Sequence, residues 1–279
     1  DSASGCQEFC RPRAAFGSAQ AKMRVALLAP TPYSKYSLVV AELLRLRGVN
    51  VCLFIVPSLF NLRRIKVTWR RERTDLLKKV WTKILSSKRD TIETPLDQLM
   101  ESEGISYQPL AKYCERHGIH YHRVKDLNSR ESADAIQQHD TDLIVFTGGG
   151  LIRKELLEST RIGILNCHWG ILPQYRGMDT TIWAEWEQQP TGISLHLMDH
   201  GVDTGPIIST YPLARGPEES FEAFHGRLEA MSAEKIVSTA RLICQGTVGP
   251  VPQEVAQGKQ YYIMHDRLRE ILVDRLENP

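Results

Sequence analysis

The sequence lacks the features that mark several specialised classes of protein. No apolar run is long enough to span a membrane, and a net charge of +2 over 279 residues gives no overall signal for nucleic-acid binding. The six cysteines are scattered, without the paired clusters that hold zinc, so no metal site is predicted. No internal repeat, Gly-Lys-Ser/Thr phosphate loop or glycine-rich dinucleotide turn is present. These absences leave an ordinary globular protein with 42% hydrophobic residues.

The chain ends differ in composition from the part between them. Residues 1–22 are rich in Ser, Ala, Gly and Arg without periodicity, which predicts a disordered extension or a tag. Residues 23–246 form the predicted main domain, and residues 247–279 a short C-terminal extension of helix and hairpin. Cys52 and Cys167 lie inside apolar runs, so we interpret them as buried free thiols of a reducing, cytoplasmic compartment.

Apolar strand-like runs alternate with helical patterns along the main domain. This alternation predicts an α/β fold with a mostly parallel, Rossmann-like sheet flanked by helices. The predicted strands are 23–29, 49–56, 142–147, 162–165 and 192–198. The predicted helices are 37–47, 108–117, 132–139, 153–159 and 218–246.

Three glycine-containing segments follow predicted strands directly. They are 148–150, 166–170 and 199–205. Ligands of such sheets bind outside the carboxyl ends of the strands, so we expect these segments to meet at one site.

The candidate catalytic residues lie in two of these segments. Asn166 and His168 are two residues apart on a strand and should face one side, with Cys167 pointing into the core. Asp203 lies in a tight turn between Gly201 and Gly205. An amide can stabilise a developing oxyanion, an imidazole can move a proton, and a carboxylate can orient the imidazole. This set of groups is typical of acyl transfer to an amine.

The run Leu-Asn-Cys-His-Trp-Gly-Ile-Leu-Pro-Gln-Tyr-Arg-Gly, with the later Gly-Val-Asp-Thr-Gly-Pro-Ile-Ile, resembles the 10-formyltetrahydrofolate-dependent formyltransferases. The resemblance is strongest from Leu143 to Pro212 and extends over residues 23–246. Trp169-Gly170-Ile171 stands where the family often has Pro-Ser-Leu. The resemblance implies the formyltransferase fold and a formyltransferase that uses 10-formyltetrahydrofolate as formyl donor in biosynthetic one-carbon metabolism.

The resemblance also implies roles for particular residues. Asn166 would stabilise the oxyanion, His168 would shuttle the proton, and Asp203 would orient His168. Residues that match the pterin-binding loops are Gly150, Leu151, Ile152, Met198, Asp199 and His200, with His200 as a backbone contact. Tyr175 and Arg176 are candidates for substrate binding, and Arg176 could instead anchor its loop. His196 is expected to be a packed strand residue.

The acceptor amine is less well defined than the donor. The turn at residues 30–33 differs from the phosphate loop of glycinamide ribonucleotide transformylase, and residues 247–279 are too few for the C-terminal barrel of methionyl-tRNA formyltransferase. A nucleotide-linked amino sugar is therefore the first choice, and an ornithine-type siderophore amine the second. A formyltetrahydrofolate hydrolase, a methionyl-tRNA-type enzyme without the barrel and a folate-binding protein without turnover stay as alternatives.

One basic segment interrupts the α/β pattern. Residues 63–89 carry many Lys and Arg, and their apolar residues recur at helical spacing. The segment is either a helix with a solvated basic face or a weak contact site for an anionic substrate or membrane surface. Docking on RNA is a third interpretation of this segment. The oligomeric state is open, with a homodimer as one option.

Overall fold

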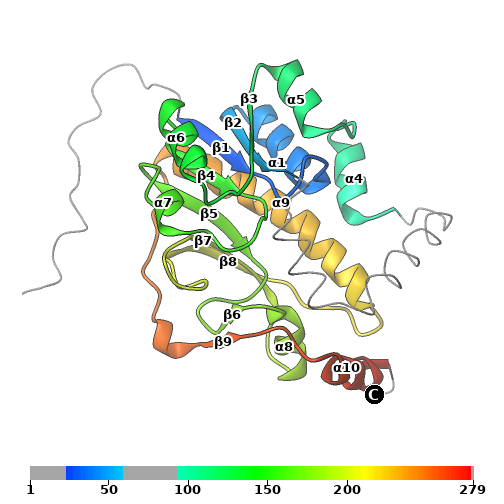
Figure 1. Ribbon diagram of the computed structural model, residues 1–279. Coiled ribbons are helices and arrows are strands. Elements are labelled where there is room, and N and C mark those ends of the chain that lie inside the picture. Colours follow the sequence, from blue (N-terminus) through cyan, green and yellow to red (C-terminus); the bar gives the residue numbers. More distant parts are fainter. Residues whose placement is uncertain (1–22, 59–92, 278–279) are drawn as a thin grey trace, which may run out of the picture.

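A computed structural model describes residues 23–58 and 93–277 (Figure 1). The predicted extension 1–22 and the basic segment 63–89 lie outside the described residues. Within the described ranges, no helix combines the length and apolar character needed to cross a membrane.

A seven-stranded sheet in the order β3-β2-β1-β4-β5-β7-β8 forms the centre of the molecule. Its strands are β1 (Arg24–Leu28), β2 (Asn50–Pro57), β3 (His120–Val124), β4 (Leu143–Phe146), β5 (Gly163–His168), β7 (Gly192–Leu197) and β8 (Ile207–Pro212). The strands from β3 to β5 are parallel, and β7 and β8 are antiparallel to their neighbours. The predicted mostly parallel α/β sheet is thereby confirmed.

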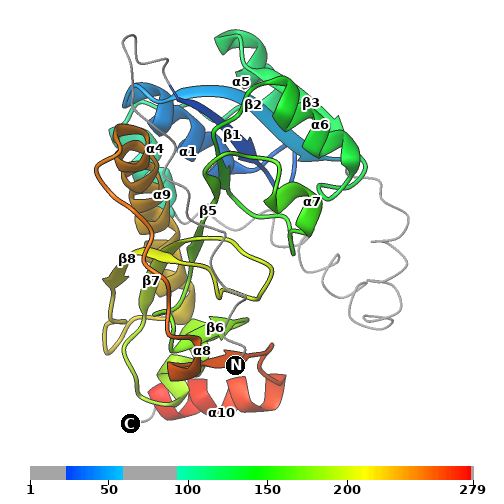
Figure 2. The same cartoon turned by 90° about the vertical axis from the view of Figure 1, so that its left-hand side faces the viewer.

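Helices cover both faces of this sheet, as Figures 1 and 2 show together. They are α1 (Lys35–Leu46), α4 (Pro95–Ser102), α5 (Leu110–His117), α6 (Arg130–Gln138), α7 (Lys154–Leu157), α8 (Thr180–Trp186), α9 (Phe221–Gln245) and α10 (Asp266–Glu277). All five predicted helices are present with ends shifted by a few residues. The capping residues set these ends: Ser34 caps α1, and Gly246 in the left-handed region ends α9.

The alternation of side chains along the strands divides the core into two clusters. In β1, Val25 and Leu27 belong to the cluster under α1, α4, α5 and α9, whereas Ala26 and Leu28 belong to the cluster under α6 and α7. Both faces of β1 are therefore apolar, which explains its continuous hydrophobic run. The cluster that contains α9 also reaches β5, so this long helix lies against the end of the strand that carries Asn166 and His168.

The C-terminal extension forms a second small sheet rather than the predicted hairpin. Strand β9 (Lys259–Tyr261) pairs in parallel with β6 (Tyr175–Gly177), which lies more than eighty residues earlier in the chain. The prediction of a hairpin, which the resemblance of the tail to amino-sugar formyltransferases implies, is wrong because the partner of this short strand lies elsewhere in the chain. Helix α10 then packs on α8 through Leu272, Met264 and Ile182.

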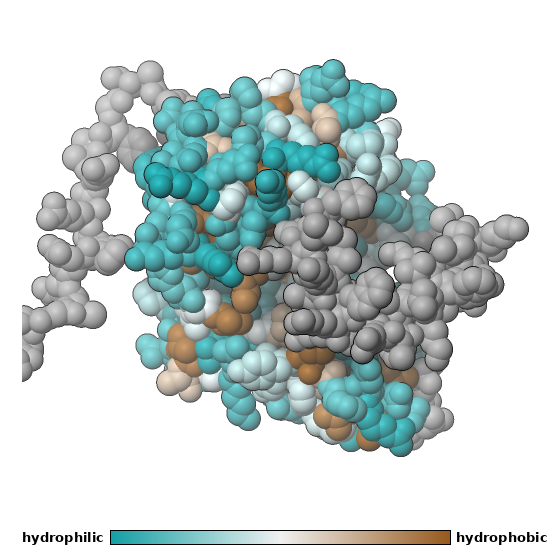
Figure 3. All heavy atoms as spheres, in the orientation of Figure 1, coloured by the Kyte–Doolittle hydropathy of each residue, from teal (hydrophilic) through white to brown (hydrophobic). Residues whose placement is uncertain are grey.

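The outer surface is mainly hydrophilic in the view of Figure 3, with apolar residues in separate small areas. Among the described residues, the cysteines are Cys52, Cys114, Cys167 and Cys244, and all are free thiols.

Candidate active site

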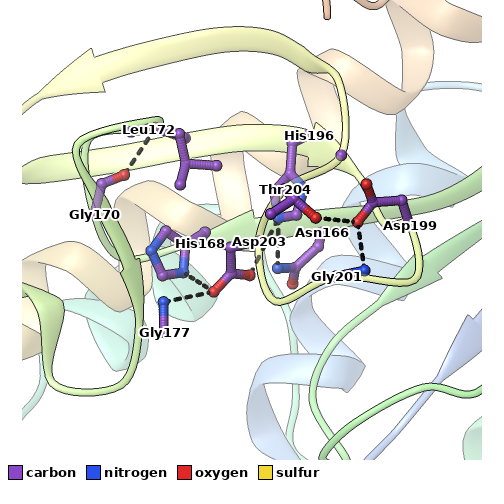
Figure 4. A network of polar contacts seen from close by, with 12 residues as sticks. Asn166, His168, Gly170, Leu172, Gly177, His196, Asp199, Gly201, Asp203 and Thr204 are labelled. Atoms are coloured by element: carbon purple, nitrogen blue, oxygen red, sulfur yellow. Dashed lines mark hydrogen bonds and ion pairs between the residues drawn. The ribbon is translucent and has the colours of Figure 1, made fainter. Parts of the chain in front are cut away.

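The three predicted catalytic side chains meet at one edge of the sheet. Strand β5 runs through Asn166 to His168, and these two residues alternate with Leu165 and Cys167, which pack against the α9 side of the core. Asp203 comes from the turn that follows the neighbouring strand β7. Its side chain points towards His168, as Figure 4 shows.

Both ring nitrogens of His168 lie close to an oxygen atom. Its Nε2–H donates to the main-chain oxygen of Tyr175 at 2.8 Å, and its Nδ1 lies 3.4 Å from Oδ2 of Asp203. The same Oδ2 accepts a hydrogen bond of 2.9 Å from the main-chain N–H of Gly177. Because Nε2 carries the proton in the neutral ring, Nδ1 next to Asp203 is the position that can accept a proton.

Gly170 makes this arrangement possible. A Cβ atom at residue 170 would lie 2.7 Å from Nε2 of His168 and 2.8 Å from the oxygen of Tyr175. A side chain there would therefore break the hydrogen bond between these two residues. This explains why a glycine follows Trp169 in the loop between β5 and β6.

Asn166 is oriented by His196, a residue whose part in the site the sequence did not reveal. Nδ2 of Asn166 lies 3.0 Å from Nε2 of His196, and this nitrogen lies 3.5 Å from Oδ1 of Asp203. Nδ1 of His196 donates to the oxygen of Leu197 at 3.1 Å, so Nε2 can accept from the amide. The expectation of a packed strand residue is correct for its burial, since His196 is 1% exposed, but the side chain faces the site. The antiparallel register pairs Asn166 directly with His196, and only this tertiary pairing places both on one face.

The pKa values of His168 and Asp203 both lie below their ordinary values. Burial lowers the pKa of His168 below its ordinary value of 6.5, and the charge of Asp203 counters this only in part. Burial alone would raise the pKa of Asp203, but His196, His168 and the Gly177 N–H together hold it below its ordinary value. At neutral pH the site therefore contains a neutral imidazole beside a carboxylate.

The predicted pterin-binding residues occupy two loops that lie close together. Ile152 and Met198 pack against the same core cluster, and Nε2 of His200 lies 3.9 Å from Oε1 of Glu158, the residue that caps the C-terminus of α7. Leu151 is 75% exposed beside Gly150. The carboxylate of Asp199 accepts hydrogen bonds from Gly201 and Thr204 and so shapes its own turn (Figure 4). An exposed apolar residue beside main-chain groups suits a flat heterocycle.

Tyr175 and Arg176 point towards the C-terminal segment instead of the catalytic residues. The Tyr175 hydroxyl donates to Glu187 at 2.7 Å, and its ring stacks on Tyr261 with 5.0 Å between centroids. Nη2 of Arg176 donates to the main-chain oxygens of residues 255 and 258 at 3.3 and 3.1 Å. Of the two roles that the sequence left open for Arg176, this geometry corresponds to the anchoring of its loop. Neither side chain lines the cavity beside the catalytic residues.

A cavity of about 400 Å³ borders Asn166 and His168. It lies at the carboxyl ends of β1, β4 and β5, and Glu229 of α9 contributes to its wall. Its lining residues are Pro30, Ser34, Tyr36, Phe146, Thr147, Gly148, Asn166, Cys167, His168, Trp169 and Glu229. The expected convergence of loops after several strands is therefore present. Cys167, expected to point into the core, packs against it and also lines this cavity, and burial raises the pKa of its thiol to about 12.

The sequence did not single out Tyr36 and Glu229 of this cavity. Glu229 lies on α9 one turn from His225 and from Ser232, and Ser232 accepts a hydrogen bond from Trp169 Nε1. The stripe that these three residues form faces the end of β5. Burial raises the pKa of Glu229 above its ordinary value, and the nearby Lys35 opposes this shift. The sequence did not reveal Glu229 as a cavity residue, because a glutamate in an amphipathic helix usually belongs to the solvated face.

Comparison with known proteins gives consistent results for sequence and fold. A family model described as formyl transferase matches residues 82–240. The methionyl-tRNA formyltransferase of Halorhodospira halophila is 32% identical over 149 residues, which are 52% of this chain and 47% of the relative. The chain thus spans about half the length of the curated relatives it matches.

Two solved structures are similar in fold. A phosphoribosylglycinamide formyltransferase from Anaplasma phagocytophilum superposes with a TM-score of 0.55 at 16% identity, over 87% of this chain and 100% of that chain. An N-formyltransferase from Helicobacter canadensis, solved with folinic acid and dTDP-3-aminofucose, gives a TM-score of 0.53 at 16% identity, over 87% of this chain and 71% of that chain.

Proposed function

Because this chain belongs to the formyl transferase family, we propose that it transfers a formyl group from 10-formyltetrahydrofolate to the amine of a small acceptor. One observation carries the proposal. An amide, a neutral imidazole and a carboxylate, from Asn166, His168 and Asp203, meet at the border of a cavity large enough for a small substrate. These are the groups that acyl transfer to an amine requires.

The donor would lie on the two loops at residues 150–152 and 198–200. The exposed side chain of Leu151 and the half-buried Ile152 and Met198 offer an apolar surface, and the loops add main-chain polar groups. This combination suits a pterin, which is flat and has hydrogen-bonding edges. Bound there, 10-formyltetrahydrofolate would supply a formyl carbon that an amine can attack.

The catalytic residues would act on this carbon and on the amine. The new bond joins the acceptor nitrogen to the formyl carbon, and the bond from that carbon to the folate nitrogen breaks. The N–H of Asn166 that His196 does not use would stabilise the charge on the formyl oxygen. Nδ1 of His168, stabilised by Asp203, would take the proton of the amine and return it to the leaving folate nitrogen. The products are the formylated amine and tetrahydrofolate.

The cavity supports a small acceptor. Its volume of about 400 Å³ suits the size of a sugar ring or an amino acid, and Glu229 and Tyr36 offer polar groups on the wall made by α9 and α1. A nucleotide-linked amino sugar remains our first choice, with its nucleotide extending beyond the cavity. An ornithine-type amine is the second choice, because the carboxylate of Glu229 complements a positive charge. Methionyl-tRNA is also an open acceptor, since relatives of that name share 32% identity with half of this chain.

A screen of acceptors tests the proposal. The protein is incubated with 10-formyltetrahydrofolate and, separately, with amino sugar nucleotides, ornithine and methionyl-tRNA, and both tetrahydrofolate and the formylated product are measured. Release of tetrahydrofolate that requires an amine supports the transferase. Formate release at the same rate without any amine would identify a hydrolase instead, and binding of folate without turnover would identify a binding protein.

A further inference from the structure

The C-terminal segment contacts both loops that hold the pair of His168 and Asp203. We call residues 251–261 the C-terminal brace. At its start, Val251 exchanges two main-chain hydrogen bonds of 2.7 and 2.8 Å with Ile207, just after the turn of Asp203. At its end, β9 pairs with β6, the strand that begins at Tyr175. One segment of chain therefore links the two halves of the site.

Gln253 fixes the turn that carries Asp203. Its side-chain NH2 donates to the main-chain oxygen of Asp203 at 3.0 Å and to that of Gly205. Two carbonyl oxygens need donors, so the NH2 group must face them. Asp203 has a φ of 53°, a left-handed conformation that costs free energy for a residue with a side chain. Such a conformation persists only where neighbouring groups hold it, and Gln253 is such a group.

The other end of the brace fixes β6. Arg176, buried at 8% exposure, donates to the main-chain oxygens of Val255 and Gly258. The segments around β6 and β9 approach each other closely. A Cβ at Gly258 would lie 1.6 Å from the oxygen of Pro173, and one at Gly177 would lie 2.1 Å from the oxygen of Tyr261. Neither position has room for a side chain.

The contacts of β6 are the ones that His168 and Asp203 depend on. The oxygen of Tyr175 accepts from Nε2 of His168, and the N–H of Gly177 donates to Asp203. The brace thus holds the main chain at Asp203 through Gln253, and the two main-chain groups of β6 through Arg176 and β9. A shift of either end changes the 3.4 Å separation of the imidazole and the carboxylate.

We propose that the C-terminal brace is part of the catalytic apparatus, with Gln253 as the residue that positions Asp203 against His168. This assignment rests on the proposed function for its effect on turnover, whereas its geometric part can be tested without substrate.

The test replaces Gln253 by Glu, which keeps the size but turns both donors into acceptors, and by Met, which removes the polar group. Both variants should lower kcat by about 10- to 100-fold, because small displacements of catalytic groups have effects of this size. The KM for 10-formyltetrahydrofolate should change less than about twofold, since the brace does not contact the loops at residues 150–152 and 198–200.

A second readout follows the imidazole of His168 directly, by NMR titration of the histidine ring carbons without substrate. The charged or titratable groups that act on this ring are Asp203, which raises its pKa, and His196, which lowers it. When Asp203 moves away, the pKa of His168 should fall in Gln253→Met, which adds no charge near the ring. In Gln253→Glu the new carboxylate would raise this pKa and oppose the fall, so that variant is judged by kcat. A loss of stability alone would leave the titration of the folded protein unchanged.

Gln245→Glu is the matched control, because it makes the same change at an exposed glutamine at the end of α9, outside the brace. It should leave kcat and the His168 titration unchanged. A normal kcat in both Gln253 variants together with a normal titration in Gln253→Met, or the same loss of kcat in Gln245→Glu, would overturn the positioning role. If the wild-type protein formylates no amine but the titration shifts as expected, the proposed function fails and the brace assignment stands.

Discussion

We propose His168 and Asp203 as the acid–base pair of the site, and main-chain groups of β6 contact both of them. We expect His168→Ala and Asp203→Ala each to lower kcat by about 10²- to 10⁴-fold, because each removes a group that handles the proton of the amine. Binding of folate should largely survive, since both groups act on the reacting centre and the proposed folate surface is made by residues 150–152 and 198–200. Stopped assays for formyl product and calorimetric titration with tetrahydrofolate measure the two effects. Turnover at the wild-type rate in His168→Ala would rule out this mechanism.

The pKa of His168 determines the expected pH dependence. Transfer requires the neutral imidazole, and burial lowers the pKa of this ring below 6.5. The rate should therefore be constant near pH 7 and fall only as the pH drops through a value below 6.5, where the ring becomes protonated. A profile of kcat/KM from pH 5 to 8 measures this limb. A midpoint above 7 would mean that another group limits the rate.

His196 acts on the reaction through Asn166. In His196→Ala the amide of Asn166 loses its partner at 3.0 Å, so kcat should fall about tenfold while the KM for the donor stays nearly constant. His196→Gln should restore part of the rate, because a side-chain oxygen can accept from the same amide. His120→Ala, an exposed histidine on β3, serves as control and should have no effect on kcat. Equal rates in His196→Ala and the control would exclude the positioning role.

At the scale of elements, a small apolar cluster packs the C-terminal helix α10 on α8. Leu272 is fully buried in it, whereas its neighbour Ile271 is 37% exposed. Leu272→Ala should lower the free energy of unfolding by about 2–4 kcal/mol, and Ile271→Ala by less than about 1 kcal/mol. Urea unfolding followed by circular dichroism compares the two variants. If both lose the same small amount, α10 does not stabilise the domain.

The elements that the sequence predicted and those that it missed differ in the origin of their stability. The runs at residues 23–29 and 142–147 are apolar on both faces, so their pattern alone identifies buried parallel strands. Strand β3 carries polar residues on a half-exposed edge, and β6 and β9 have three residues each. Such strands are stabilised by a partner elsewhere in the chain, and local pattern does not contain that information.

At the scale of the whole molecule, binding of the donor should stabilise the fold. The proposed surface comprises the loops after β4 and β7, which flank β5 in the sheet. Because folding brings these loops together, tetrahydrofolate should bind the folded state and not the unfolded chain. Tetrahydrofolate at 100 times its Kd should add about 2.7 kcal/mol to the free energy of unfolding. Differential scanning calorimetry with and without tetrahydrofolate measures the shift in Tm. The shift should persist in His168→Ala, and its absence in the wild-type protein would contradict the donor assignment.

The sequence by itself determined the α/β sheet and the choice of Asn166, His168 and Asp203 as candidate catalytic residues, because hydrophobic period and residue type are local properties. The cavity beside Asn166 and His168, the orientation of Asn166 by His196 and the contact of Gln253 with the turn of Asp203 were decided only by the tertiary structure. Each joins residues from distant parts of the chain, and their approach depends on strand register and close packing. Arg176 illustrates the difference. Its charge suits either the binding of an anionic substrate or the anchoring of its loop, and only the tertiary structure places its guanidinium beside the main-chain oxygens of Val255 and Gly258.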